Sequence, residues 1–293
     1  MSKIAMLGFG EAARAIVAGW HASNQGTVSV ISTFDVKYDD VAQRPDIVEV
    51  CRDLRVQCAE TVGEALAGSD AIFSLVTADR ALDAAKSAGE FIRAGALYFD
   101  CNSCAPSTKK AASAAINNAG SRYVDVAVMA PIHPARHRTL MLLAGTAAEE
   151  AHRLLATLGM NTKVVGPEIG QASAIKMLRS VMIKGMEALT AECMLAARRA
   201  GVEEAVVASL QASDPGFDWR ARSAYNLERM IVHGARRAAE MQEVANTLCD
   251  FGLPDRMTRA AVEWQRQIAD LSLSASEGSL AWRADRILER LKP

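Results

Sequence analysis

A glycine-rich turn between a strand and a helix, close to the start of the chain, restricts the fold more than any other feature. The apolar run Lys3–Leu7 is followed by the turn Gly8–Ala13, and apolar residues recur at helical spacing over Ala12–Ala22. A second strand pattern covers Thr27–Phe34 and ends in Asp35, 27 positions after the first glycine. The order strand, glycine turn, helix, strand predicts a βαβ unit that begins a parallel sheet.

Each part of this turn has a physical role if a dinucleotide lies against it. Gly8 permits the tight turn, Gly10 lets the backbone approach a pyrophosphate, and Ala13 is small enough for the helix to lie on the sheet. The free N–H groups that open the helix attract phosphate charge. Asp35 can accept hydrogen bonds from the ribose diol and repels a 2′-phosphate, which favours NAD over NADP. A glycine-rich turn that binds no nucleotide is the alternative. The candidate cofactor-binding residues are Gly8, Phe9, Gly10, Glu11, Ala12, Asp35, Val76, Thr77 and Ala78.

Strand and helix patterns alternate as far as residue 168, and the patterns after it are helical. The strand-like segments are 55–59, 71–76, 97–101, 123–128, 140–144 and 163–165, and the helical ones between them are 61–67, 80–92, 107–119 and 147–158. The later helical segments are 172–200, 203–212, 219–240 with a break near Tyr225, 241–251, 256–268 and 279–291. We predict an α/β fold class: a doubly wound Rossmann domain at 1–168 that binds NAD, and an all-helical domain at 169–293 for substrate binding and dimerisation. A long interdomain helix joins them.

The charge balance bears on the partners of this protein. Lys and Arg number 33 against 34 Asp and Glu, a net charge of −1, so no net field would hold the chain on nucleic acid or an anionic membrane. The N-terminus enters a strand pattern directly, and no stretch approaches ~18 uncharged apolar residues. We expect a soluble cytoplasmic protein with a small-molecule substrate, no nucleic-acid partner and no membrane partner.

The six cysteines are scattered, and we expect them to be reduced, buried apolar residues. Cys101 and Cys104 form a CxxC pair, but no second CxxC or histidine pair completes a zinc site. We therefore assign no metal.

The helix that opens the second domain carries polar side chains along an otherwise apolar segment. Residues 170–185 read GQASAIKMLRSVMIKG, so Lys176, Ser180 and Lys184 follow at intervals of four and share one side of a helix. Burial of Lys176 beside a cofactor, with a second ammonium nearby, would favour its free amine and let it take a proton. The alternative is an ordinary amphipathic helix whose lysines extend to solvent.

Four motifs resemble those of the β-hydroxyacid dehydrogenase family, which includes 3-hydroxyisobutyrate dehydrogenase and 6-phosphogluconate dehydrogenase. They are GFGEAA at 8–13, DCNSCAP at 100–106, DVAVMAP at 125–131 with RTLMLLAG at 138–145, and GQASAIKMLRS at 170–180. The resemblance covers the first domain and the helix that follows it. It implies hydride transfer between a nicotinamide cofactor and a small 3-hydroxy acid or sugar acid, with Lys176 as the catalytic general acid/base, and a homodimer formed through the helical domain.

The chain departs from the family pattern where the substrate would bind. The family's Ser-Gly-Gly is Met129-Ala130-Pro131 here, its usual Asn four residues after the lysine is Ser180, and Lys184 is an additional lysine. Residues 233–241, HGARRAAEM, resemble a poorly characterised C-terminal domain type of the same superfamily. The resemblance therefore supports the family's reaction class for this chain more strongly than it supports any particular substrate. The candidate substrate-binding residues are Asn102, Ser103, Ser180 and Lys184.

Two other classes of protein stay open as alternatives. A non-catalytic dinucleotide-binding protein would not need Lys176. An NADP-dependent imine or ketimine reductase would not be expected to carry Asp35 or this lysine.

Several candidate residues also have alternative interpretations. Asn102 and Ser103 either orient a substrate at a strand end, or they cap the helix that begins near Ser107 or close the turn at Pro106. We expect His133 and His137 to be loop or surface residues rather than catalysts. The pair Arg236-Arg237 either forms a solvated helix face or reaches a substrate anion.

Overall fold

The computed structural model describes residues 2–23, 28–274 and 278–291, in two compact units, Met1–Lys176 and Met177–Pro293. The predicted first residue of the second strand, Thr27, lies outside the described residues. The predicted domain boundary at residues 168 and 169 stays a prediction. Helix α7 (Gln171–Arg199) begins in the first unit and continues into the second.

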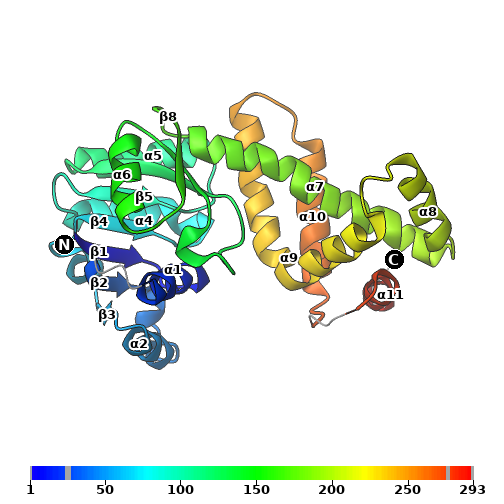
Figure 1. Cartoon of the computed structure of the whole chain (residues 1–293), viewed down its shortest axis with the longest axis horizontal. Coiled ribbons are helices and arrows are strands. Elements are labelled where there is room, and N and C mark those ends of the chain that lie inside the picture. Colours follow the sequence, from blue (N-terminus) through cyan, green and yellow to red (C-terminus); the bar gives the residue numbers. More distant parts are fainter. Residues whose placement is uncertain (1, 24–27, 275–277, 292–293) are drawn as a thin grey trace. The chain divides into compact units, whose positions relative to one another are not determined.

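The first unit contains a sheet of eight strands among the described residues (Figure 1). The strands are β1 (Ser2–Leu7), β2 (Val28–Phe34), β3 (Gln57–Cys58), β4 (Ala71–Ser74), β5 (Leu97–Asp100), β6 (Arg122–Val128), β7 (Met141–Ala144) and β8 (Thr162–Gly166). Their order is β3-β2-β1-β4-β5-β6-β7-β8, and every neighbouring pair is parallel except β6 and β7. The predicted doubly wound sheet is confirmed, and the strand order reverses between β1 and β4, where such sheets bind ligands.

Helices cover both faces of this sheet because successive side chains of a strand point to opposite faces. The α-helices are α1 (Glu11–Ala22), α2 (Arg44–Asp53), α3 (Val62–Leu66), α4 (Ala81–Phe91), α5 (Pro106–Asn118) and α6 (Ala148–Thr157); the 3₁₀ helices are η1 (Val36–Tyr38), η2 (Ala78–Arg80) and η3 (Arg136–Arg138). Apolar side chains of α1, α2 and α6 pack on one face, and those of α3, α4 and α5 pack on the other.

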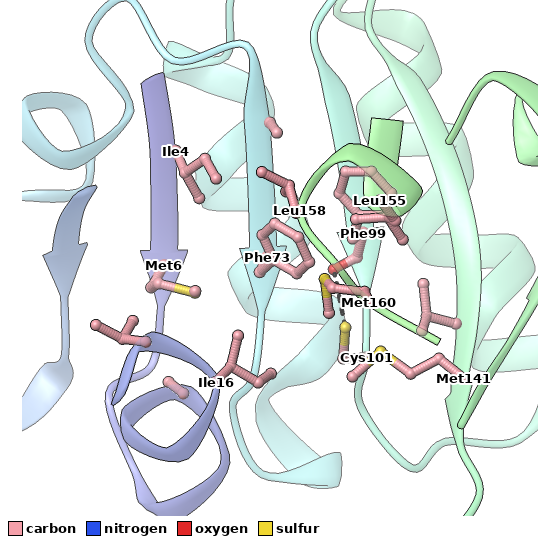
Figure 2. Packing of buried hydrophobic residues seen from close by; sticks show 14 of the residues in the cluster. Ile4, Met6, Ile16, Phe73, Phe99, Cys101, Met141, Leu155, Leu158 and Met160 are labelled. Atoms are coloured by element: carbon pink, nitrogen blue, oxygen red, sulfur yellow. Dashed lines mark hydrogen bonds between the residues drawn. The ribbon is translucent and has the colours of Figure 1, made fainter. Parts of the chain in front are cut away.

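Aromatic rings fill the centre of the first of these two cores. Phe73 of β4 and Phe99 of β5 stack with their centroids 4.7 Å apart, and Trp20 of α1 meets Phe73 edge-on at 5.8 Å. Figure 2 shows Ile16 and Leu155, from two different helices, on the same side of the strands as the two phenylalanine rings. This packing fixes the strand ends, from which the loops of the candidate site emerge.

The described residues of the second unit form helices and their connections, with no strand. It comprises the later part of α7 with α8 (Glu203–Ser213), α9 (Trp219–Asp250), α10 (Arg256–Asp270) and α11 (Leu280–Arg290). Helix α9 runs for 32 residues without interruption, so the predicted break near Tyr225 and the predicted division after residue 240 are wrong. Neither place carries a proline, and α9 is held along its length by apolar packing against α10 and α11. None of the helices in the described residues combines the length and apolar character that a membrane span requires.

The cysteines are all free, but their predicted burial is only partly correct. Cys51, Cys101 and Cys104 are buried and Cys58 is half-buried. Two others, at positions 193 and 249, are exposed on the sides of α7 and α9 that face away from the core of their unit.

Candidate functional site

The turn after β1 has the geometry that its glycines predict. Gly8 has a φ of +84°, and a Cβ atom added there would lie 2.7 Å from the carbonyl oxygen of Leu75 and 3.0 Å from Val76. Only glycine fits this position without strain. By contrast, no heavy atom lies within 4 Å of the Cβ position of Gly10, so the surface above Gly10 is open to a ligand.

Asp35, at the end of β2, is tied to this turn. Its Oδ2 accepts a hydrogen bond from the backbone N–H of Phe9 at 2.7 Å, and its Oδ1 accepts one from Lys37 N–H at 3.0 Å. A carboxylate offers about four acceptor positions, so two remain for the hydroxyls of a ribose. Asp35 therefore both fixes the glycine turn and presents a negative charge beside it.

The N-terminus of α1 presents backbone donors at the same place. Gly10 precedes the helix without a side-chain cap, Glu11 is exposed and Ala12 is half-buried. Arg14 donates from Nε to the carbonyl oxygen of Phe9 at 2.7 Å, which further fixes the turn. The open space above the second glycine, the uncapped N–H groups and the aspartate together fit the pyrophosphate and ribose of a nicotinamide dinucleotide.

The other predicted cofactor residues follow β4, the strand beside β1. Val76 lies beside the glycine turn, because a Cβ added to Gly8 would be 3.0 Å from Val76 Cγ1, and Thr77 is exposed at the start of η2. The carbonyl oxygen of Ala78 accepts a hydrogen bond from the Cys104 thiol at 3.4 Å, which links this loop to the loop after β5. The CxxC sulfurs are thus engaged with backbone carbonyls, since Cys101 donates to Phe99 at 3.8 Å (Figure 2). Burial raises the pKa of Cys101 to about 12, which leaves it an inert thiol.

Lys176 and Ser103 meet at the carboxyl edge of the sheet. Ser103 follows β5 by three residues and Lys176 lies in the second turn of α7. The Lys176 ammonium donates a hydrogen bond from Nζ to Ser103 Oγ at 2.6 Å, and both side chains are half-buried. The structure thus brings together two residues that are 73 positions apart in the chain.

Asn102, the neighbour of Ser103, is 4% exposed and only partly satisfied. Its side-chain amide donates from Nδ2 to Ser74 Oγ at 2.9 Å, while its Oδ1 has no hydrogen-bond partner in the described part of the chain. Leaving a buried carbonyl oxygen without a donor costs about 1–3 kcal/mol. A ligand that donates a hydrogen bond here would remove that cost. Ala105, not Asn102 or Ser103, precedes the first residue of α5, so the alternative role of these two residues as helix caps is not seen.

Three buried charged residues near this site were not among the predicted functional residues. The Lys109 ammonium on α5 donates to the Asp100 carbonyl oxygen at 2.6 Å and to its Oδ1 at 2.9 Å, and it lies 3.7 Å from Asp125 Oδ1. The three side chains are 0–1% exposed. The signal in the sequence is the aspartate that opens each of the motifs DCNSCAP and DVAVMAP. These two aspartates lie directly opposite each other in the sheet register. Two buried carboxylates at this separation need a cation between them.

Ser180 and Lys184, the other predicted substrate residues, belong to the second unit. Ser180 is 6% exposed. Lys184 is buried, and its Nζ lies 2.6 Å from Oε2 of Glu240 on α9. The charge of Lys184 is therefore compensated within its own unit, and roles for the two residues in substrate binding stay predictions.

The histidines and the arginine pair differ in part from expectation. His133 is exposed. His137 lies in the connection between β6 and β7, which fits the loop position that we predicted, but it is not on the surface: it is buried against α1, where Gly19 has no Cβ to collide with the ring. Burial and the neighbouring arginines lower the pKa of His137. Arg237 is buried and pairs with Glu187 at 2.5 Å, whereas Arg236 is exposed. Only Arg236 lies on a solvated face.

Two family models match parts of this chain. A family model described as the NAD binding domain of 6-phosphogluconate dehydrogenase matches residues 3–170, and one described as a domain of unknown function (DUF1932) matches residues 197–268. The first match covers more than half of the chain. It supports binding of a nicotinamide cofactor by the first unit.

Solved structures cover nearly the whole chain. A conserved hypothetical protein from Sinorhizobium meliloti 1021 is 36% identical, over 99% of this chain and 97% of its own, with a TM-score of 0.79. A conserved protein of unknown function with structural similarity to 3-hydroxyacid dehydrogenases is 30% identical, over 92% and 97%, with a TM-score of 0.72. The 3-hydroxyisobutyrate dehydrogenase of Mycobacterium tuberculosis, solved with L-serine, is 13% identical over 97% and 98% with a TM-score of 0.73, which shows a shared fold. The chain therefore belongs to the β-hydroxyacid dehydrogenase family, with an NAD-binding domain of the 6-phosphogluconate dehydrogenase type.

Proposed function

We propose that this protein is a dehydrogenase that transfers hydride between NAD and the hydroxyl-bearing carbon of a small 3-hydroxy acid or sugar acid, with Lys176 as general acid/base. The observation that carries the proposal is the hydrogen bond of 2.6 Å between Lys176 Nζ and Ser103 Oγ at the carboxyl edge of the sheet. Ligands of parallel sheets bind at this edge, where the glycine turn also lies.

The pair has the properties that proton transfer requires. Oxidation of an alcohol releases the hydroxyl proton while the bound nicotinamide accepts the hydride. For reduction, the Lys176 ammonium donates to Ser103 Oγ, so the Ser103 hydroxyl hydrogen can go to a substrate oxygen. For oxidation, the free amine of Lys176 can take the substrate proton directly, or take the Ser103 hydroxyl proton while Ser103 Oγ takes the proton of the substrate.

The proposed choice of cofactor rests on Asp35. Its two bonds to backbone N–H groups hold the carboxylate in place, so it cannot easily turn away from a ligand on the glycine turn. A fixed negative charge at the ribose position accepts hydrogen bonds from two hydroxyls and repels a 2′-phosphate.

The proposed substrate class rests on Asn102 and on the family. The unsatisfied Oδ1 of Asn102 lies one residue from Ser103, so it can accept a hydrogen bond from a hydroxyl of the substrate or of the cofactor. The relative that was solved with L-serine shares the fold, and serine is itself a 3-hydroxy acid. The segment Met129-Ala130-Pro131 replaces the family's usual carboxylate-binding residues, so the proposal stops at the class of substrate.

A substrate screen tests the function directly. Purified protein is mixed with a panel of 3-hydroxy acids and sugar acids and with NAD or NADP, and the reduced nicotinamide is followed by its absorbance. We expect turnover of at least one hydroxy acid, faster with NAD. Reduction of cyclic imines with NADPH and no oxidation of any hydroxy acid would instead identify an imine reductase.

Replacing Lys176 by methionine tests its role. The variant keeps the length and apolar stem of the side chain, so the fold and the NAD affinity should survive. We expect kcat to fall by ~10²–10⁴, the contribution of a positioned proton-transfer group. Lys184→Met is the matched control on the same helix, and it should lose much less because Lys184 is paired with Glu240. A Lys176→Met enzyme with nearly normal kcat would show that the acid/base is another group.

A further inference from the structure

A buried cluster of charges connects the two chain segments that carry the proposed catalytic pair. Asp100 ends β5 and Asp125 lies opposite it on β6, in register. Lys109 of α5 lies between them, within 2.9 Å of one carboxylate and 3.7 Å of the other. Tyr123 donates its hydroxyl hydrogen to Asp100 Oδ2 at 2.5 Å. All four side chains are buried.

The cation in this cluster stays charged. Burial alone would lower the pKa of Lys109, but the carboxylates of Asp100 and Asp125 outweigh it and raise the pKa above its ordinary value. Two buried carboxylates without this ammonium would repel each other in a region from which water is excluded. Lys109 therefore decides whether the two aspartates can lie side by side.

Each aspartate holds one of the segments on which the catalytic pair stands. Asp100 Oδ1 accepts from the backbone N–H of Asn102 at 3.0 Å, which fixes the loop leading to Ser103. Asp125 Oδ2 accepts from the N–H groups of Gly170 at 3.0 Å and Ser173 at 3.1 Å. It also accepts from the Ser173 hydroxyl at 3.3 Å. Asp125 thus caps the first turn of α7, three residues before Lys176.

Stability alone does not account for such a cluster. Apolar residues of similar volume commonly stabilise a core as well as a buried ion pair does, because each charge loses its hydration. Within the described residues Asp125 Oδ1 has the ammonium at 3.7 Å as its counter-charge and no hydrogen bond. What the cluster does provide is a fixed position for two loops relative to each other.

We propose that Lys109 is a positioning residue for the reaction: by binding both Asp100 and Asp125, it holds the Ser103 loop and the first turn of α7 at the separation that lets Lys176 reach Ser103. This inference rests on the proposed function for its kinetic consequence. Its structural consequence is independent of catalysis.

The first test is the variant Lys109→Met, with Lys110→Met as the control from the exposed neighbouring position. Because two uncompensated carboxylates could unfold Lys109→Met, the double variant Lys109→Met/Asp125→Asn is made as well. An asparagine oxygen can still cap α7, and one negative charge is removed. The concentration of active sites in every variant is measured as the stoichiometry of NAD binding by calorimetry. Unfolded protein is thereby excluded from the calculation of kcat.

The kinetic readout is kcat per NAD-binding site. A shift of about 1 Å in a catalytic group can cost ~10²-fold in rate, so we expect a loss of ~10–100-fold in both Lys109 variants, with a smaller change in KM. We also expect the pH dependence of kcat to change. The limb that is due to Lys176, identified by its absence in Lys176→Met, should shift in both Lys109 variants, because Lys176 would lose its contact with Ser103. A purely structural role for Lys109 predicts an unchanged kcat per site and an unchanged pH profile, which would overturn the inference.

The second readout does not depend on activity. Amide hydrogen exchange should become faster at both residues 101–105 and residues 170–173 in the Lys109 variants, and at neither in Lys110→Met. If the substrate screen fails but exchange rises in both segments, the proposed function is wrong and the positioning role stands. If exchange rises in neither segment, the positioning role is wrong, whatever the substrate.

Discussion

At the scale of single residues, two glycines of the same turn have different jobs. Gly8 is needed by the protein itself, because its φ of +84° and its 2.7 Å approach to the Leu75 carbonyl leave no room for a side chain. Gly10 is surrounded by open space and is needed only if a ligand comes close to the backbone.

Alanine substitutions separate these two roles. We expect Gly8→Ala to lose about 1–3 kcal/mol of stability, from strain at positive φ and the contact with Leu75. Gly10→Ala should unfold like the wild type but bind NAD more weakly. Thermal unfolding and calorimetric NAD titration of both variants measure the difference. A stable Gly8→Ala protein, or unimpaired NAD binding by Gly10→Ala, would contradict this assignment.

Asp35 can be tested without disturbing the turn that it holds. Asp35→Asn keeps an oxygen for the Phe9 N–H but removes the charge, whereas Asp35→Ala removes both. We expect the asparagine variant to keep its melting temperature and to shift its preference from NAD toward NADP. The alanine variant should also be less stable. Tighter binding of NADP than of NAD by the wild type would show that Asp35 does not select the cofactor.

At the scale of elements, the strands were predictable from short apolar runs, but the partners of the buried charges were not. Lys109 stands in the sequence PSTKKAASAA, where a lysine pair is typical of an exposed helix face, and nothing local distinguishes it from the exposed Lys110. Its burial follows from two aspartates that come together only when β5 and β6 pair. The bond between Asp125 and Ser173 spans 48 residues, so it too depends on the complete fold.

The contact between α9 and α10 depends on the absence of a side chain at Gly234. An added Cβ would lie 2.6 Å from the carbonyl oxygen of Gln265 and 3.0 Å from Ala269 Cβ. Gly→Ala within a helix normally stabilises by about 0.5–1 kcal/mol, but here we expect Gly234→Ala to destabilise by about 1–3 kcal/mol through overpacking. Gly185→Ala in α7, where no atom lies within 4 Å, is the control and should be neutral or stabilising. Chemical unfolding of both variants gives the ranking.

At the scale of the whole molecule, the class of fold could be predicted correctly from the sequence pattern, whereas the surface through which two chains would associate could not. Residues 193–197 of α7, CMLAA, form an apolar segment of the kind that occurs at dimer surfaces, yet Met194 and Leu195 are buried in the core of their own unit. A pattern of apolar residues cannot tell an internal helix face from an external one when both are apolar. Likewise, the family motifs pointed to Lys176 and to Ser103 separately. The hydrogen bond between their side chains could not be predicted, because only the complete fold brings them together.

We propose that the protein forms a homodimer through another side of α7. Met182 and Leu189 are 65% and 54% exposed, and Cys193 and Ala196 follow on the same side at helical spacing. Ultracentrifugation at micromolar concentration should give a dimer, and Leu189→Glu should give a monomer. A thiol reagent should modify Cys249 rapidly in both, but Cys193 rapidly only in the variant. A monomeric wild type would sink the proposal.

The antiparallel strand β7 affects how substrate specificity can diverge within this family. Because β7 runs antiparallel to β6, the chain leaves β6 and returns to β7 at one edge, and the Met129 N–H donates to the Leu140 carbonyl oxygen at 2.9 Å to close the segment between them. Residues 130–139 therefore have ends that are fixed by the sheet, and Ile132, His137 and Thr139 within them are buried and must be kept. The exposed positions of this segment, at the carboxyl edge of the sheet, can be rewritten or extended by evolution or by a protein engineer without altering a strand, since loop closure costs little extra per added residue.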